Sequence, residues 1–274
     1  MRPRKLKLAL LYIAAVVGLV VTTFPYLYMG IQSFSPWDEV DRRILPSKLT
    51  LRSYRWLFAG GGAAKPWFRA FLNSCIVAGS STAAIVFSAA LVGYALSWSR
   101  FRGRKTIYNL ILFQMFYPGI VLLVPTFLLV RWLGLYNTYG GMILPKAFHL
   151  WAVFLYTSFF ATIPKEIVES ARVDGASELR VIFNIVLPMS RSITAVIFLI
   201  EFMRRWEELL WDMIVVQDYQ KMTLNVLLAM MAKGEYIDFP GPMYAASFVL
   251  TFPILVLFLI FGKRFVEGFA MTLK

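Results

Sequence analysis

The sequence contains little cysteine and little histidine, with one residue of each type in 274. The lone cysteine, Cys75, cannot form an intramolecular disulfide or a cysteine-based metal site. The lone histidine, His149, rules out a multi-histidine site and lies in an apolar block, where no Ser/His/Asp set can be assembled. We therefore expect no catalytic site and no metal site, and we predict that this chain is not an enzyme.

A phosphate-binding loop of the form Gly-x-x-x-x-Gly-Lys-Ser/Thr is also absent. The stretch at 60–66 has glycines and Lys65, but the spacing differs and Pro66 follows the lysine. If the protein uses ATP, another chain must bind it. We expect this chain to bind no cofactor of its own.

Acidic residues are outnumbered, because 15 Asp and Glu stand against 28 Lys and Arg, which gives a net charge of +13. In a soluble protein such a charge would favour nucleic acid as a partner. Here the basic residues cluster beside apolar blocks, as they do next to anionic membrane lipid. We therefore expect contact with a lipid bilayer and no nucleic-acid partner.

Apolar residues make up 59% of the chain, whereas about 45–50% is usual in soluble domains. They form blocks that are long enough for the roughly 20 helical residues that cross a bilayer core. Strand alternation and internal repeats are not found. We therefore predict an all-α, polytopic membrane protein with six transmembrane helices in one domain over 1–274. The expected spans are 8–29, 71–98, 107–130, 142–163, 192–216 and 243–261.

Basic residues near the ends of the spans predict the orientation. With the N-terminus inside, the segments 2–7, 97–106, 164–191 and 262–274 are cytoplasmic and carry four, four, four and three basic residues. The loop at 31–70 would lie outside and disagrees, because it carries seven. The first helix usually sets the orientation, so we expect both termini in the cytoplasm.

The segment at 164–190 has the pattern of two short helices. Pro164 suits a first helical turn, Gly175 can end a helix with a positive φ angle, and Ser177 can cap the helix that follows. An apolar stripe then continues as far as Pro188. By physical chemistry alone, an ordinary amphipathic connector and a docking element explain the segment equally well.

The residues of this segment resemble the "EAA" loop of ABC importer permeases. The family pattern is Glu-Ala-Ala, three residues, Gly, and then a hydrophobic-x-Leu-Pro. In this sequence the pattern begins at Glu169, and Ser170 stands in place of the first alanine. The resemblance implies a cytoplasmic loop that couples the permease to a separate ATPase. The implied coupling residues are Glu169, Ser170, Ala171, Asp174, Gly175, Ala176, Leu187 and Pro188.

The resemblance covers most of the chain and is to the maltose-type, carbohydrate-uptake permeases. Matching stretches include 71–74, 93–96 and 133–138, whereas the tail at 269–274 departs from the family. It implies a complex in a bacterial or archaeal cytoplasmic (inner) membrane. The expected partners are a homologous second permease subunit, two ATPase subunits that bind ATP and Mg²⁺, and an external solute-binding protein that delivers a sugar.

The fifth block, at 192–216, contains six charged residues, each of which would cost at least about 2.5–3.5 kcal/mol at a bilayer centre. On one continuous helix five of them fall within an arc of roughly 100°. The pairs Glu201–Arg205 and Arg204–Glu208 would then be i,i+4 neighbours. The stripe is interpreted either as a salt-bridged interface with the second permease or as a lining of the substrate path. The expected path residues are Arg204, Arg205, Trp206, Glu208, Trp211 and Asp212.

The two arginines raise the hypothesis of an acidic substrate, such as a uronate oligosaccharide or a sugar phosphate, because arginine binds carboxylate and phosphate well. Lys146 and His149, one turn apart in the fourth block, are interpreted either as internally bonded or as substrate contacts. The alternative function is an ion-gradient-driven secondary transporter or channel, which would predict self-sufficient transport and inverted repeats.

Overall fold

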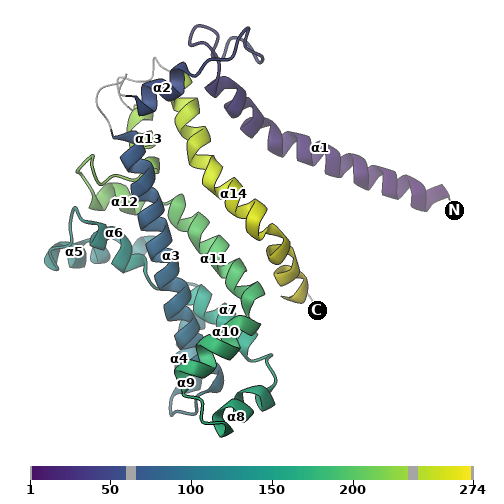
Figure 1. Ribbon diagram of the computed structural model, residues 1–274, viewed down its shortest axis with the longest axis vertical. Helices are drawn as coiled ribbons and strands as arrows, with labels where there is room; N and C mark the ends of the chain where they lie inside the picture. Colours follow the sequence, from purple (N-terminus) through teal and green to yellow (C-terminus); the bar gives the residue numbers. More distant parts are fainter. Residues whose placement is uncertain (1, 60–65, 234–239, 273–274) are drawn as a thin grey trace. The chain divides into compact units, whose positions relative to one another are not determined.

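The computed structural model describes residues 2–59, 66–233 and 240–272, and it places side chains for 7–59, 66–232 and 240–262. The glycine-rich stretch at 60–65 and the side chains of the tail lie outside these ranges. Every regular element within them is a helix, which confirms the predicted all-α class (Figure 1). In chain order the elements are α1 (Arg2–Ser33), α2 (Arg52–Phe58), α3 (Trp67–Trp98), α4 (Arg104–Gln114), η1 (Gly119–Leu122), α5 (Leu123–Trp132), α6 (Tyr139–Ile143), η2 (Leu144–Lys146), α7 (Leu150–Phe160), α8 (Lys165–Val173), α9 (Glu178–Val181), η3 (Ile182–Val186), α10 (Leu187–Met189), α11 (Arg191–Trp206), α12 (Leu210–Val215), α13 (Leu224–Lys233) and α14 (Pro240–Thr272).

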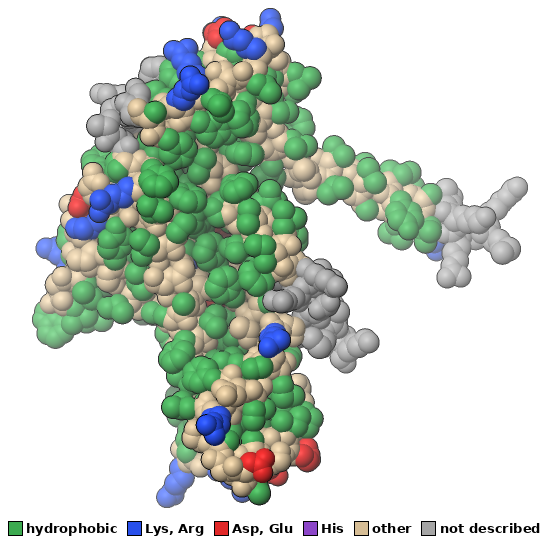
Figure 2. Space-filling view, viewed as in Figure 1, with side chains coloured by type: hydrophobic (Ala, Val, Ile, Leu, Met, Phe, Trp, Pro, Cys, Tyr) green, Lys and Arg blue, Asp and Glu red, His purple; other side chains and the backbone are tan. Residues whose placement is uncertain are grey.

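Three helical stretches are long and apolar enough to cross a membrane: Lys7–Ser33, Trp67–Trp98 and Pro240–Gly262. Three bent pairs of helices would bring the number to six if each pair is one span. Hydrophobic side chains cover much of the face seen in Figure 2, and those of α1 are exposed along the helix. Such a surface suits lipid as the surrounding solvent. The count of six spans stays a prediction.

The predicted middle spans are broken rather than continuous. The third bends by 97° between α4 and η1, because Pro118 has no N–H to donate and disfavours a helical residue before it. The fifth consists of two helices, since α11 ends at Trp206 and α12 begins at Leu210. Between them, Glu208 Oε1 accepts the backbone N–H of Trp211 at 3.2 Å. This side-chain cap satisfies an N–H at the start of α12.

The chain divides into two compact units. Unit 1 comprises Met1–Phe68 and Leu227–Pro253, and unit 2 comprises Arg69–Val226 and Ile254–Lys274. In unit 1, the Asp41 carboxylate accepts the hydroxyl of Tyr28 at 2.9 Å and that of Tyr244 at 2.6 Å. These bonds connect the loop after α1 to α1 itself and to the first part of α14.

The apolar core of unit 2 lies where α3, α7 and α11 pack together. Its fully buried members include Ile85, Tyr156, Phe160 and Ile197. A Cβ atom added to Gly93 of α3 would lie 2.7 Å from Cβ of Tyr156 in α7. The glycine therefore permits a close approach of the two helices, as small residues do in membrane proteins.

Candidate functional site

The segment after α7 folds as the predicted pair of short helices, α8 and α9. In α8, Val168 and Ala171 are buried in the core of unit 2, whereas Glu169 and Ser170 are exposed. Asp174, just after the helix, is exposed as well. Acidic side chains gather at the end of unit 2 that carries α8 (Figure 2). The outward face of α8 thus carries Glu166, Glu169 and Ser170 beside the exposed Lys165 and Val173, and Ala171 packs against its own chain.

Gly175 makes the turn between the two helices with a φ angle of +80°. Crowding is not the reason for a glycine there, because nothing lies within 4 Å of a Cβ built on it. The left-handed backbone is the reason. Ser177 then caps α9 by accepting the N–H of Arg180 at 3.4 Å. The predicted turn and cap are both confirmed, and Ala176 between them is half-buried.

An ion pair that sequence reasoning missed ties this turn to α3. Nε and Nη2 of Arg172 donate to the two carboxylate oxygens of Glu178 at 2.9 and 3.1 Å. Tyr94 of α3 donates its hydroxyl to the same carboxylate and accepts from Arg172 Nη2 at 3.3 Å. The Glu178 carboxylate, more than any other neighbour, raises the pKa of Arg172. Opposite charges on either side of Gly175 were a signal for the pair, but nothing in the sequence pointed to Tyr94.

The helix that follows the turn is irregular before it reaches α11. Residues Ile182–Val186 form a π-helical segment. Pro188 has no N–H for the usual bond to the carbonyl of Asn184, and the wider segment accommodates this loss. After Met189 the chain bends by 85° into α11. Leu187, which packs against the core of unit 2, and Pro188 therefore lie at the corner between the loop and the charged helix.

A cavity of about 800 Å³ lies in unit 2 among α4, α5, α7, α11 and α12. Its wall combines aromatic side chains with polar and charged ones, which is the usual composition of a binding site for a small polar molecule. The polar, charged and aromatic side chains that line it are Gln114, Tyr117, Thr126, Lys146, Phe148, His149, Trp151, Glu201, Arg204 and Trp211.

Glu201 is the centre of one ionic cluster in this wall. Its side chain is fully buried and lies 2.5 Å from His149 Nδ1 and 2.8 Å from Arg204 Nη2. His149 and Arg204 keep 34% and 39% of their side-chain surface exposed. The buried carboxylate therefore orients two basic groups whose remaining surface is free to meet a ligand. His149 is thus both internally bonded and part of the cavity wall.

A second cluster centres on Arg205, which is buried and does not line the cavity. Its Nη2 lies 3.3 Å from Asp212 Oδ1, and its Nη1 lies 3.5 Å from Glu208 Oε2. Lys146 Nζ is 3.6 Å from the same Glu208 oxygen. The pairs Glu201–Arg204 and Arg205–Glu208 are i,i+3, whereas the predicted pairs were i,i+4. Because α11 ends at Trp206, Glu208 no longer lies one helical turn above Arg204.

The two tryptophans of the predicted path lie in different surroundings. Trp211 lines the cavity, donates from Nε1 to the carbonyl of Gly141 at 3.1 Å, and has Lys146 Nζ 5.4 Å from its ring centre. Trp206 is buried with its ring near those of Phe71 and Phe202. The structure thus places Arg204 and Trp211 at the cavity and Arg205, Trp206 and Asp212 in the interior.

The charged groups pair with one another rather than converge on a metal position. In the ranges that the structure describes, no three metal-binding side chains come together. The cavity wall could present basic, hydroxyl and aromatic groups to a polar ligand.

A family model for "Binding-protein-dependent transport system inner membrane component" matches residues 57–266. The sn-glycerol-3-phosphate transport system permease protein UgpE of Salmonella typhi is 31% identical over 260 residues, which is 92% of each chain. The arabinooligosaccharides transport system permease protein AraQ of Halalkalibacterium halodurans is 31% identical over 257 residues, which is 90% of this chain and 89% of its own. The matches to the two relatives span nearly the whole sequence.

A solved bacterial ABC transporter involved in the import of the acidic polysaccharide alginate contains a chain of similar fold. The TM-score is 0.81 at 22% identity, over 97% of this chain and 98% of the other. The broken middle helices and the loop at 164–190 therefore belong to a fold that occurs in a solved transporter.

Proposed function

The chain belongs to the family of binding-protein-dependent transport system inner membrane components, and we propose that it is one permease subunit of an ATP-driven importer of sugars. A homologous second permease would complete the pathway, two ATPase subunits would bind ATP and Mg²⁺, and an external solute-binding protein would deliver the substrate. The absence of a phosphate-binding loop from this sequence supports an ATPase site on another chain.

The observation that carries this proposal is the exposed face of α8, held to α3 by the Arg172–Glu178–Tyr94 cluster. A partner that moves α8 would pull on α3 through these hydrogen bonds, and also on α11 through the bent helix at Pro188. Glu169, Ser170 and Asp174 are the exposed residues that would meet the ATPase. Under the proposed topology both chain termini and this loop lie in the cytoplasm, as the basic residues near the helix ends predict.

The coupling role can be tested with Gly175→Pro and Glu169→Lys in the assembled transporter. Proline cannot adopt a positive φ angle, and lysine reverses the charge of the exposed face. We expect both variants to reach the membrane and the partner ATPase to hydrolyse ATP, but uptake in proteoliposomes to be lost.

The matched controls are Gly175→Asn and Glu169→Asp. Asparagine tolerates the left-handed conformation better than most residues, and aspartate keeps the charge, so both should retain most of the uptake. Normal uptake by Gly175→Pro and Glu169→Lys would show that the segment at 164–190 does not couple.

The substrate that we propose is an anionic sugar, such as a uronate oligosaccharide or a sugar phosphate. The cavity wall presents Lys146 and Arg204, with His149 beside them, and among the described residues Glu201 is the one carboxylate that lines it. That carboxylate is already bonded to His149 and Arg204. The UgpE relative is described as transporting sn-glycerol-3-phosphate and the solved transporter as importing acidic alginate. The AraQ relative is described as a permease for arabinooligosaccharides, so uptake must be measured with an anionic sugar and with a neutral oligosaccharide.

Uptake by the Arg204→Gln variant distinguishes an anionic substrate from a neutral one. A hydrogen bond to a charged group contributes about 1.5–3 kcal/mol, so we expect uptake of an anionic sugar at limiting concentration to fall about tenfold or more, and uptake of a neutral oligosaccharide to change little. Arg191→Gln, at the start of α11 and away from the cavity, is the control. Equal uptake of the anionic sugar by Arg204→Gln and the parent would exclude the acidic substrate.

A further inference from the structure

The turn between α3 and α4 is strongly basic and has no acidic neighbour in the sequence. It carries Arg100, Arg102, Arg104 and Lys105, and the chain has no Asp or Glu between Asp41 and Glu166. The Arg104 guanidinium donates weakly to the carbonyl of Ser99, at 3.5 Å. Among the described residues, no carboxylate lies within ion-pair distance of Arg104 or Lys105. Their charge is therefore available to a ligand.

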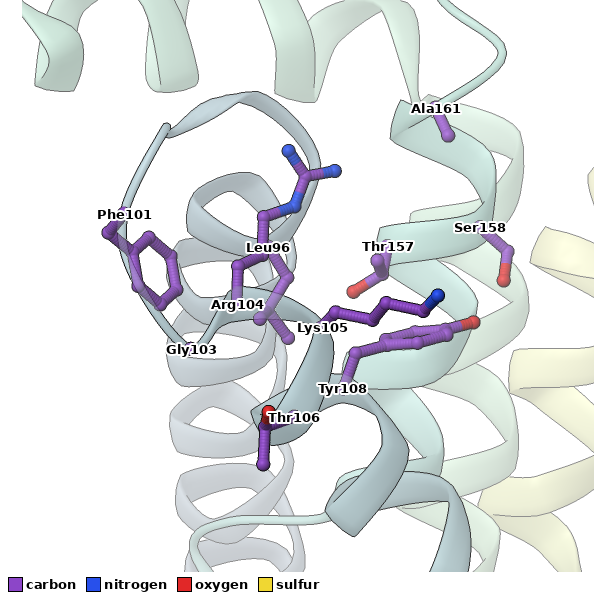
Figure 3. A pocket seen from close by; sticks show the side chains of 10 residues that line it. All are labelled: Leu96, Phe101, Gly103, Arg104, Lys105, Thr106, Tyr108, Thr157, Ser158 and Ala161. Atoms are coloured by element: carbon purple, nitrogen blue, oxygen red, sulfur yellow. The ribbon is translucent and has the colours of Figure 1, made fainter.

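Two of these basic residues line a second cavity in unit 2, of about 650 Å³, between the start of α4 and the end of α7. Figure 3 shows Lys105 and Tyr108 extending side by side toward the helix that carries Thr157 and Ser158. Arg104 and Phe101 belong to the same wall. The wall therefore combines two cations with hydroxyl groups and aromatic rings, and none of the described residues that line it is acidic.

The backbone adds to the positive potential of this cavity. Gly103 precedes α4 with a φ angle of +88°, and as a glycine at the N-cap position it provides no side-chain hydrogen bond to the helix. The first turn of the 11-residue helix thus presents uncapped N–H groups beside the cavity. Such a terminus favours an anion, and phosphate in particular.

α4 also carries exposed apolar side chains, none of which is among the described residues that line the cavity. Ile107, Leu110 and Phe113 recur every three residues, and all three side chains are exposed. Residues at this spacing lie on neighbouring parts of a helix surface. At 100° per residue, Ile107 and Leu110 lie about 160° and 140° around α4 from Lys105. The acyl chains of a lipid bound at Lys105 would therefore reach this apolar surface by passing around α4. A free phosphate has no such chains, and an acidic protein surface gains little from exposed apolar side chains.

We propose that the cavity between α4 and α7 binds the phosphate of an anionic phospholipid, with Arg104 and Lys105 as its cationic contacts. The acyl chains would lie along the exposed face of α4. Basic pockets between helices at a membrane surface are known to bind lipid headgroups. Placement in the inner leaflet rests on the proposed topology, whereas lipid binding itself does not.

Native mass spectrometry of the full chain in detergent tests this proposal, with phosphatidylglycerol and phosphatidylcholine as probes. The variants are Arg104→Gln, Lys105→Gln and their combination. Each cationic contact at a membrane surface changes affinity about fivefold. We expect each single variant to lose about that factor for phosphatidylglycerol, the double variant to lose about 25-fold, and phosphatidylcholine binding to stay unchanged. Lys105→Arg should restore most of the binding, which separates loss of charge from misfolding.

Arg102→Gln is the matched control, because Arg102 is in the same turn and does not line the cavity. Three results would overturn the proposal. The first is equal phosphatidylglycerol binding by the parent and the double variant. The second is displacement of the lipid by inorganic phosphate at equal concentration, which would indicate a free-phosphate site. The third is an equal loss of phosphatidylglycerol binding by Arg102→Gln and Arg104→Gln, which would indicate a response to net charge rather than a site in the cavity.

Discussion

Two arginine–carboxylate clusters in unit 2 use the same chemistry in opposite surroundings. Arg172 and Glu178 form a bidentate pair with side chains that are 34% and 55% exposed. Arg205 and Asp212 pair at 3.3 Å with side chains that are 0% and 1% exposed. Water hydrates the charged groups of the first pair, so their ion pair contributes little to the stability of the fold. In the second pair each charge depends on the other, because neither can be hydrated.

The difference indicates which contacts can open during a transport cycle. The exposed pair at the turn after α8 costs little to break, so its proposed role is to connect α8 to α3 rather than to stabilise the fold. The buried pair must persist, and its bonding is incomplete: Nε of Arg205 and Oδ2 of Asp212 have no hydrogen-bond partner among the described residues. The buried cluster therefore has little tolerance for the loss of either charge.

The largest expected effect is that of Arg205→Met. The substitution leaves the buried Asp212 carboxylate without its cationic partner, and breaking a buried pair in this way costs about 3–5 kcal/mol of stability. We expect a large drop in thermal unfolding temperature in detergent. The double variant Arg205→Met with Asp212→Leu should recover most of the loss, since no buried charge remains. Arg191→Met, at the start of the same helix and with an exposed side chain, is the control. If Arg205→Met unfolds at the same temperature as the parent, the pair of Arg205 and Asp212 does not stabilise the fold.

An intermediate effect is expected for Gly93→Ala in α3, one residue before Tyr94. The added Cβ would meet Tyr156 of α7, and overpacking of this kind costs about 1–3 kcal/mol. Gly79→Ala is a matched control in the same helix, because nothing lies within 4 Å of its Cβ position. Thermal unfolding of the two variants measures the difference. Equal stability would mean that α3 and α7 pack less closely than the structure indicates.

The smallest effect on stability is expected for Arg172→Gln, at most about 1 kcal/mol, as for other exposed ion pairs. Uptake should nevertheless fall relative to ATP hydrolysis, because α8 loses its connection to Glu178 and Tyr94. Arg180→Gln removes an exposed charge from α9 and should leave uptake unchanged. A large loss of stability in Arg172→Gln would mean that the pair of Arg172 and Glu178 stabilises the fold as the buried pair of Arg205 and Asp212 is expected to do.

Local features of the loop at 164–190 could be read from the sequence because they depend on near neighbours in the chain. The φ angle of Gly175 and the cap at Ser177 are set within a few residues, and both were predicted. Tyr94 could not be predicted as a partner of Glu178, since the two residues are 84 positions apart. Which residue of α3 meets the loop depends on the packing of α3 against α7.

The sequence by itself determined the all-α class, the apolar helices, the glycine turn and the cap at Ser177. These features follow from composition, helical periodicity and backbone preferences, all of which are local. The tertiary structure alone decided that α11 ends at Trp206, that Arg204 faces a cavity and that Arg205 is buried. The spacing of charged residues predicts which side chains are neighbours only within one uninterrupted helix. Once Glu208 caps a new helix, long-range packing determines which charges meet a ligand and which meet each other.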